Sequence, residues 1–163
     1  MKEILLTRGK TAMVDDDDYI RFGTFPWYAF KGKCSWYAYR SIYKDKKVSG
    51  LKLHRCIMNA PKGIEVDHIN GNGLDCRRSN MRLCATAENL RNKGKQINNT
   101  SGYKGVDFSK EMNKWRAKVQ FNKKRYHAGY FQTAIEAAKA YDKLAAKLHG
   151  EFARLNFACQ PAS

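Results

Sequence analysis

The chain has 163 residues, with 31 Lys and Arg against 15 Asp and Glu, so its net charge is +16. A hydrophobic content of 43% argues against disorder throughout, and the length allows one domain or two small ones. The excess of positive charge indicates a polyanionic partner. Because the charge is spread over many segments and no apolar run approaches the roughly 18 residues of a membrane span, nucleic acid is favoured over a membrane.

The five cysteines do not form any Cys-x-x-Cys pair. Their odd number and their spacing disfavour a disulfide framework or a Cys-rich zinc site. Buried or idle thiols in a reducing cytosol are the simpler interpretation, and the polar N-terminus "MKEILLTRGK" is too short for a signal peptide, so a cytoplasmic location is expected. The cysteines are Cys34, Cys56, Cys76, Cys84 and Cys159.

Residues 1–60 predict short, aromatic-rich strands separated by Gly, Lys-Asp and Pro turn signals. The stretch "SGLKLHRCIM" is interpreted as one of these strands, which makes His54 a packed residue that could approach a site nearby. The run Asp15 to Asp18 lacks the spaced ligands of a calcium loop. It is interpreted as a solvated turn that caps a short helix at "YIRF".

Residues 64–68, "IEVDH", predict a strand that ends on the pair Asp67-His68. A polar, Gly-rich loop over residues 69–79 follows, then a strand "MRLCA" and a brief helix with Thr86 as its predicted N-cap. Such a loop is a poor place to build a hydrophobic core. Its composition therefore indicates a functional site.

Hydrolysis of a phosphodiester needs a base to activate water, and positive charge on the phosphate and on the departing oxygen. Histidine can be the base, and one divalent cation, Mg²⁺ or Mn²⁺, can supply the charge through carboxylate, amide and water ligands. Asp67, His68 and Asn89 provide these groups, provided that the helix of Asn89 packs against the strand of Asp67. Asn80 is expected to tie the loop to the strand and to hold His68 in a productive tautomer.

The run "VDHINGNGLDCRRSNMRLCATAENLRN" resembles the HNH endonuclease motif of phage and intron homing enzymes, the ββα-metal class. The resemblance implies that His68 is the general base, that Asp67 and Asn89 bind the metal, and that Asn80 holds the loop. It also implies a small ββα-metal core and cleavage to 5′-phosphate and 3′-hydroxyl ends. Asp-His and Asn-Gly pairs are individually common, so a purely structural loop is the alternative.

Three arginines of the motif, Arg77, Arg78 and Arg82, are candidate clamps on the DNA backbone. The competing interpretation is that they only keep the loop soluble.

Residues 93–100 predict a basic linker between an N-terminal part, residues 1–92 with the nuclease motif at 64–92, and a second domain, residues 101–158. In "KWRAKVQF" apolar and polar residues alternate, and "RYHAGYF" continues after a turn with Arg125 and His127 on the polar face. Thr133 and Glu136 have the form of a capping box. The helix that follows should stop at Gly150 and should pack on the sheet through residues at helical spacing, namely Ile135, Ala138, Tyr141, Ala145 and Leu148.

The second domain also resembles the plant ethylene-response, APETALA-type, DNA-binding domain, on the matches "YKGV", "KWRAKV" and "LNF". That resemblance implies a three-stranded antiparallel sheet packed on one helix, with the sheet in the major groove. Asp107, Ser109 and His127 depart from the plant pattern, so the plant target sequence is not carried over. The candidate DNA contacts, from position and from the strand face, are Lys104, Arg116, Lys118, Gln120, Arg125 and His127.

The expected fold is therefore α+β: a strand-rich N-terminal region with a ββα-metal nuclease core, then a sheet packed on a helix. The expected function is a site-specific HNH endonuclease of the homing type that binds double-stranded DNA and acts as a monomer, without an evident protein partner, in a bacterial or phage-infected cell. A monomer with one site would most simply nick, but the sequence does not determine whether one strand or both are cut. A non-catalytic DNA-binding regulator on a nuclease scaffold is the alternative. An RNA-binding protein ranks last, since the outer sheet face is expected to offer only His127 for stacking on bases.

Overall fold

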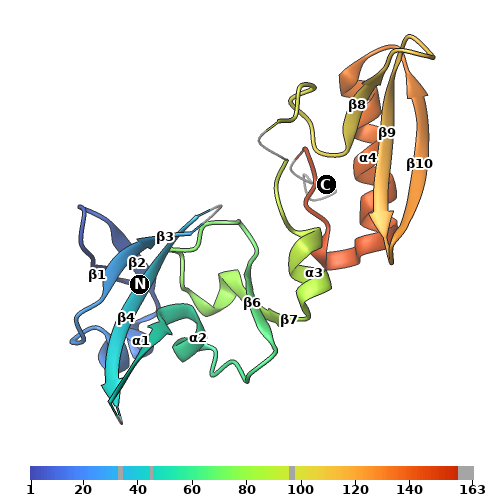
Figure 1. Ribbon diagram of the computed structural model, residues 1–163. Coiled ribbons are helices and arrows are strands. Elements are labelled where there is room, and N and C mark those ends of the chain that lie inside the picture. The colour runs from blue at the N-terminus through green and yellow to red at the C-terminus, as the bar shows by residue number, and fades with distance from the viewer. Residues whose placement is uncertain (33–34, 45, 96–97, 158–163) are drawn as a thin grey trace. The chain divides into compact units, whose positions relative to one another are not determined.

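The computed structural model describes residues 1–32, 35–44, 46–95 and 98–157 (Figure 1). Contacts divide the chain into two compact units, Met1–Asn89 and Leu90–Ser163, each with its own hydrophobic core. None of the helices in these ranges is long and apolar enough to cross a membrane. The predicted mixed class is confirmed, since small antiparallel sheets and helices occur in the same chain.

The N-terminal unit contains three small antiparallel sheets, β1-β2, β3-β4-β5 and β6-β7. Its strands are β1 Lys2–Leu5, β2 Thr11–Val14, β3 Tyr28–Lys31, β4 Trp36–Lys44, β5 Lys47–Lys52, β6 Glu65–His68 and β7 Met81–Cys84. Its helices are α1 Asp16–Phe22, α2 Leu53–Ile57 and the 3₁₀ turn Arg78–Asn80, and α3 Thr86–Arg91 follows β7. Sheets this small cannot bury an apolar face alone, so they share one core.

That core collects side chains from every sheet of the unit. Its buried members include Val14 of β2, Ala38 of β4, Leu53 of α2 and Val66 of β6, together with Trp27 ahead of β3. The loop after β6 also contributes Leu74 and Cys76. The apolar residues of the loop thus pack in the core, and its polar residues are available to form a site.

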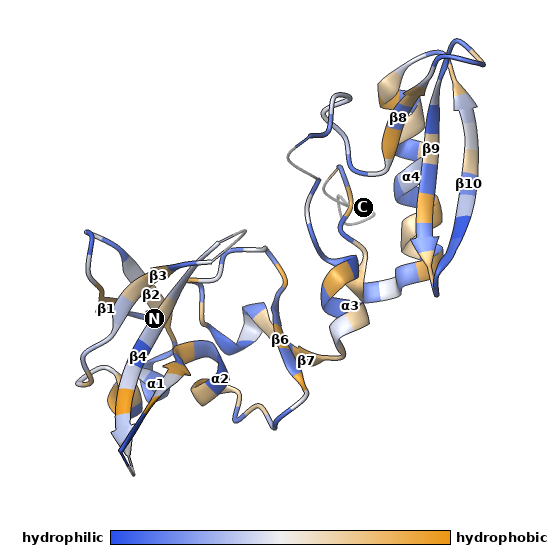
Figure 2. Ribbon diagram, in the orientation of Figure 1, coloured by the Kyte–Doolittle hydropathy of each residue, from blue (hydrophilic) through white to orange (hydrophobic). Residues whose placement is uncertain are grey.

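The C-terminal unit is a three-stranded antiparallel sheet in the order β10-β9-β8 with helix α4 packed against it (Figure 1). The strands are β8 Val106–Ser109, β9 Lys114–Phe121 and β10 Lys124–Phe131, and the helices are α4 Ala134–His149 and the 3₁₀ turn Gly150–Phe152. Hydrophobic and hydrophilic residues follow one another along β9 (Figure 2). Ala117 and Val119 are buried, as the alternation predicted.

Helix α4 begins and ends where predicted. Thr133 and Glu136 form the reciprocal capping box, and Gly150 follows the last helical residue with φ of 56°. Gly105, in the "YKGV" stretch, also needs to be glycine, because a Cβ there would lie 2.1 Å from the ring of Tyr141.

Several local predictions are wrong. "SGLKLHRCIM" is not one strand: β5 ends at Lys52 and α2 begins at Leu53, since Leu53 and Ile57 bury one face of a helical turn. Ile135 is 50% exposed. The burial expected for Ala138, Tyr141 and Ala145 is confirmed. Ala137 is buried instead of Ile135, because a small side chain there lets α4 lie close to the sheet.

Helix α3 begins at Thr86 itself, and it is the Glu88 side chain that accepts a hydrogen bond from the N–H of Ala85. Thr86 is therefore the first helical residue and does not cap the helix. Cys56, Cys76 and Cys84 are free thiols, in agreement with the interpretation of the cysteines, whereas Cys34 and Cys159 lie outside the described residues.

The acidic run starts the predicted short helix, α1, and Asp16 and Asp17 are exposed, but the run is not solvated throughout. Asp18 is 1% exposed, and Arg78 donates to both of its carboxylate oxygens, each at 2.8 Å. The guanidinium of Arg78 also donates to the carbonyl of Ile57, and the backbone N–H of Arg78 donates to the carboxylate of Asp15. The first residues of α1 thereby hold the end of the 69–79 loop.

We predict that Arg78→Ala lowers the free energy of unfolding of the N-terminal unit by about 3 kcal/mol, because it leaves a buried carboxylate without its partner. Arg21 is a matched control: it lies 3.9 Å from the same carboxylate but is 61% exposed, so Arg21→Ala should cost less than about 1 kcal/mol. Urea unfolding followed by the fluorescence of Trp27 and Trp36, in a Trp115→Phe background, measures both. Equal losses in the two variants would contradict the assignment.

Candidate nuclease site

Asp67 and His68 are the last two residues of β6, which pairs with β7 in antiparallel register. Asp67 lies opposite Arg82, whose Nε and Nη2 donate to Asp67 Oδ2 at 2.9 and 2.8 Å. Both Asp67 and His68 are buried. A carboxylate and an imidazole thus stand next to each other in an environment with little water.

Asn80 closes the polar loop on the residues that follow His68. Its side-chain oxygen accepts from the N–H of Asn70 at 3.1 Å, and its amide donates to Asn70 Oδ1 and to the carbonyl of Asp75. Its carbonyl accepts from the N–H of Ile69 at 2.9 Å. The start and the end of the loop are therefore joined directly beside His68.

Asp75 anchors the middle of the same loop. It is 1% exposed and accepts from Asn70 and, at 2.7 Å twice, from the guanidinium of Arg77. The Arg77 hydrogen bonds hold the pKa of Asp75 below its usual value. Backbone hydrogen bonds from Met13 to Leu74 and from Cys76 to Met13 attach this segment to β2.

Burial lowers the pKa of His68 to about 4, although Asp67 and Asp75 oppose the shift. The imidazole is therefore neutral at neutral pH, which is the form that can take a proton from water. The ring of Tyr37 lies 6.1 Å from that of His68, between centroids.

His54 approaches the site, as the sequence allowed. Its ring lies edge-on to that of His68, with 5.0 Å between centroids, and 5.4 Å from the ring of Tyr37. Burial, with a smaller contribution from His68, lowers the pKa of His54 to about 3. Its Nδ1 is buried and makes no hydrogen bond within the described part of the chain.

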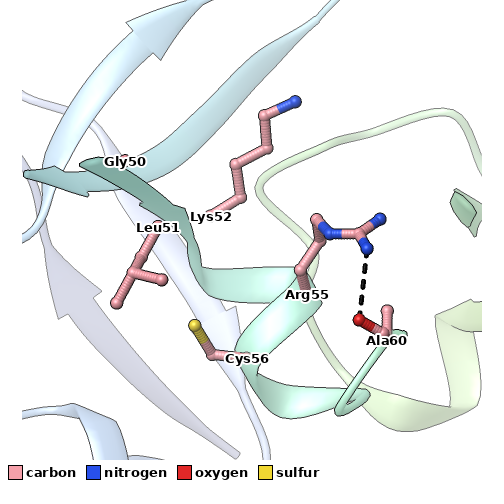
Figure 3. Close-up of a pocket in the computed structure, with 6 residues that line it drawn as sticks. All are labelled: Gly50, Leu51, Lys52, Arg55, Cys56 and Ala60. Atoms are coloured by element: carbon pink, nitrogen blue, oxygen red, sulfur yellow. Dashed lines mark hydrogen bonds between the residues drawn. The ribbon is translucent and has the colours of Figure 1, made fainter. Parts of the chain in front are cut away.

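The backbone that leads into β6 is held by Arg55 of α2. Its guanidinium donates to the carbonyls of Ile64, Ala60 and Pro61 at 2.6, 3.1 and 2.9 Å. Figure 3 shows Arg55 and Ala60 at the edge of a pocket beside β5. No predicted site residue lines this pocket, and its lining contains no carboxylate or imidazole, so we assign Arg55 a structural role.

The donor chemistry of Asp67 and Asn89 suits a hard cation such as Mg²⁺. Asn89 is half-buried on α3, and Arg82 already places positive charge against Asp67, so a cation would compete with that guanidinium or share the carboxylate with it. The described residues contain no cluster of three His, Cys, Asp or Glu side chains that could bind an ion. The remaining ligands would be water, as Mg²⁺ accepts.

Each of the three motif arginines is in an ion pair, which neither the clamp nor the solubility interpretation included. Arg77 binds Asp75, Arg78 binds Asp18 and Arg82 binds Asp67. Arg82 is only 14% exposed, whereas Arg77 is 36% and Arg78 49% exposed. A phosphate could reach the last two more easily. Asp75 is only two residues from Arg77, whereas Asp18 is 60 residues from Arg78 and could not be identified from spacing.

In the C-terminal unit, most of the predicted contact residues do share one face of the sheet. Lys118 is opposite His127 and Gln120 opposite Arg125, in the register of β9 and β10. A register shift between His127 and Gly129 brings Tyr130 opposite Arg116. The expectation that this face offers only His127 for stacking is therefore wrong, because the irregularity returns Tyr130 to the polar face.

Two features of this face were not expected. Asp107 accepts from Arg116 at 2.5 Å and lies 2.9 Å from the Lys118 ammonium. Burial would raise the pKa of Asp107, but hydrogen bonds from Arg116 and Lys118 outweigh it and lower the pKa. Lys104 is not on the face: its ammonium donates to the carbonyl of Arg91, and burial lowers its pKa to about 8.

Comparison with known proteins finds similar chains for both parts. A family model described as HNH endonuclease matches residues 59–91. Protein 3.8 of Escherichia phage T7 is 38% identical over 94 residues, which are 58% of this chain and 77% of that protein. An uncharacterized HNH endonuclease of Acanthamoeba polyphaga mimivirus is 34% identical over 131 residues, 76% of this chain and 67% of that protein.

An AP2-like ethylene-responsive transcription factor of Arabidopsis thaliana is 38% identical over 58 residues, 36% of this chain and 12% of that protein. No solved structure matches the chain significantly.

We predict that His54 makes the N-terminal unit sensitive to acid. Its folded pKa of about 3 lies below the unfolded value of about 6.5, so the unfolded chain binds more protons once the pH falls below 6.5. The contribution of neutral His54 to the free energy of unfolding is complete above about pH 6.5 and is lost as the pH falls toward 3. Between pH 7 and 5, wild type should lose about 2 kcal/mol more than His54→Gln.

Urea unfolding at each pH, by the same tryptophan fluorescence, checks this difference. The exposed His127 is the control, since His127→Gln should follow wild type. Parallel pH curves for wild type and His54→Gln would show that His54 does not titrate in this way.

Proposed function

Because the chain belongs to the HNH endonuclease family, we propose that it is a site-specific, divalent-metal-dependent DNA endonuclease of the homing type. The observation that carries the proposal is the neutral, buried His68 beside Asp67 at the end of β6, in a loop closed by Asn80. The proposed place of action is the cytoplasm of a bacterial or phage-infected cell, in line with the phage relative.

In the proposed reaction His68 takes a proton from water, and the resulting hydroxide attacks the phosphorus in line with the leaving oxygen. Asp67 and Asn89 are the proposed ligands of the divalent cation, which when bound supplies positive charge to the phosphate and the 3′ oxygen. The products are 5′-phosphate and 3′-hydroxyl ends. A monomer with one such site would nick one strand.

Asn80 is proposed as a positioning residue. Its hydrogen bonds to Asn70 and Ile69 restrain the backbone next to His68, and this restraint would keep the imidazole directed at water. Arg77 and Arg78 are proposed to approach the DNA backbone with their exposed edges while they remain bound to Asp75 and Asp18.

The C-terminal unit is proposed to deliver the nuclease to its target. Its basic sheet face would enter a groove of duplex DNA, and residues 93–100 would link this domain, residues 101–158, to the nuclease domain, residues 1–92. Phosphate contacts would set the register and base contacts would give specificity. The proposed contacts are Arg116, Lys118, Gln120, Arg125 and His127.

A non-catalytic DNA-binding regulator remains the second candidate. The observation that favours it is the Arg82 guanidinium on Asp67, because a carboxylate held this way could serve the fold alone. Tyr130 likewise gives the sheet face an aromatic group that an RNA-binding protein could use. Competition between duplex DNA and RNA separates that third alternative from the first two.

We predict that His68→Ala abolishes metal-dependent nicking of supercoiled DNA, with at least a 100-fold loss in rate, because the base is removed. The plasmid should carry the flanking sequence of the gene, in Mg²⁺ or Mn²⁺ at low salt. DNA binding should persist. His127→Gln changes a histidine of the other unit and should still cut when the enzyme is saturating.

Nicking that survives in His68→Ala would contradict the assignment of the base. Tight duplex binding without cutting by wild type would favour the regulator.

We predict that Asp107→Asn tightens duplex binding by about fivefold at low salt. The change removes a negative charge and releases Arg116 and Lys118 from an ion pair worth about 1 kcal/mol. Fluorescence anisotropy over a range of salt concentrations measures the effect. Glu111→Gln, in the β8–β9 turn, removes the same charge and should have a smaller effect; equal effects would mean that only net charge matters.

A further inference from the structure

Three cationic side chains of the N-terminal unit gather around one aromatic ring. The guanidinium carbon of Arg8 lies 5.8 Å from the centroid of the Trp36 ring, and the ammonium groups of Lys10 and Lys31 each lie 5.6 Å from it. These four residues are called the Trp36 cluster below. None of them belongs to the nuclease site described above.

The cluster is assembled from two hairpins that are fastened together. Arg8 lies in the β1–β2 turn, and Thr7 of that turn accepts a hydrogen bond from the N–H of Ala29 in β3 at 3.0 Å. Lys31 and Trp36 lie opposite each other across the β3–β4 ladder. The backbone therefore fixes where the three charges meet.

The turn carries Arg8 in a backbone conformation that disfavours it. Arg8 has φ of 61° and Gly9 has φ of 60°, and the carbonyl of Thr7 accepts from the N–H of Lys10. Both central residues of such a turn need positive φ, for which Asn and Gly are preferred. An arginine there stores strain, and strain of this kind is concentrated at functional positions.

Charge gives a second indication. None of the three cations forms an ion pair with any acidic side chain in the described ranges. Cation–π contacts at exposed sites are weak, about 0.5–1 kcal/mol each, and like charges near one ring repel one another. An anion bound between them would relieve this repulsion, and a chain of phosphates would do so for all three.

The cluster adjoins the polar loop of the nuclease site. Ser35, next to Trp36, accepts a hydrogen bond from the N–H of Gly73 at 2.9 Å. A Cβ on Gly73 would lie 2.5 Å from the carbonyl oxygen of Trp36 and equally close to the ring of Tyr37. Tyr37 is in turn the aromatic neighbour of His68. The loop that contains Gly73 therefore packs on the strand that carries the cluster.

We propose that the Trp36 cluster binds the sugar-phosphate backbone of the duplex, independently of base sequence. The inference rests on the proposed nuclease function and gives the N-terminal unit its own contact with the substrate. Arginine can bind phosphate oxygens bidentately and the two lysines act as point charges, so the surface fits a polyphosphate backbone. Trp36 holds the three cations in place before DNA arrives.

The test is the salt dependence of DNA binding by the full chain. The variant is Arg8→Asn with Lys10→Gln and Lys31→Gln, in which asparagine at position 8 keeps the turn. The control removes three charges elsewhere on the same unit, by Lys2→Gln, Lys47→Gln and Lys62→Gln. All proteins also carry His68→Ala, so that DNA stays intact and binding is measured separately from cutting.

Each phosphate contact contributes about 0.9 to the slope of log affinity against log salt. The cluster variant should lose about 2–3 from the magnitude of this slope, equally on a target duplex and a scrambled one, and the control less than about 1. Equal slopes for the two triple variants would overturn the proposal. A loss confined to duplex RNA or to phosphatidylserine vesicles would overturn it too.

The double variant Lys10→Gln with Lys31→Gln keeps Arg8 and Gly9 in the turn. It should lower the magnitude of the salt slope by about 2, and it tests the proposal if the triple variant does not fold. If the protein with His68 intact never cuts DNA, a smaller slope in the cluster variant would still support the cluster and would count against the nuclease. Normal cutting by the protein with His68 intact, together with an unchanged slope in the cluster variant, would count against the cluster alone.

Discussion

Three carboxylates of the N-terminal unit are almost completely excluded from water, and an arginine of the polar loop or of β7 binds each of them. Removal of an ion from water costs several kcal/mol unless a partner and further hydrogen bonds compensate. The three pairs therefore compensate the burial of charge that the folded loop between β6 and β7 requires. The pairs are Asp18–Arg78, Asp75–Arg77 and Asp67–Arg82.

The exclusion of water that makes these pairs necessary also sets the chemistry of the site. It keeps the imidazole of His68 neutral, because a buried imidazolium would need compensation that Asp67 and Asp75 supply only in part. Arg82 meanwhile compensates the negative charge of Asp67 in an ion pair. If the proposed cation binds there, it enters a site whose carboxylate is already paired with Arg82, and its affinity would then be linked to the stability of the hairpin.

The two basic surfaces of the chain differ in one physical respect. On the C-terminal sheet, Asp107 holds Arg116 and Lys118 in fixed positions, at the expense of net charge. Around Trp36 the cations are held by the ring and by the backbone, and no described acidic side chain pairs with them. Cations held in fixed positions on the sheet suit selective hydrogen bonds to DNA. Cations around Trp36 that have no acidic partner suit attraction to phosphates regardless of sequence.

Local patterns in the sequence were sufficient for the strands β6, β7, β9 and β10 and for α4 with its capping box, since alternation and caps depend on neighbouring residues. The motif also indicated which polar residues to consider, His68 and Asn80 among them. Tertiary structure decided the rest: Asp18 meets Arg78 from 60 positions away, and the irregularity in β10 turns Tyr130 outward. Such contacts are set by packing and by the need to pair buried charges, and neither leaves a signal in the spacing of residues along the chain.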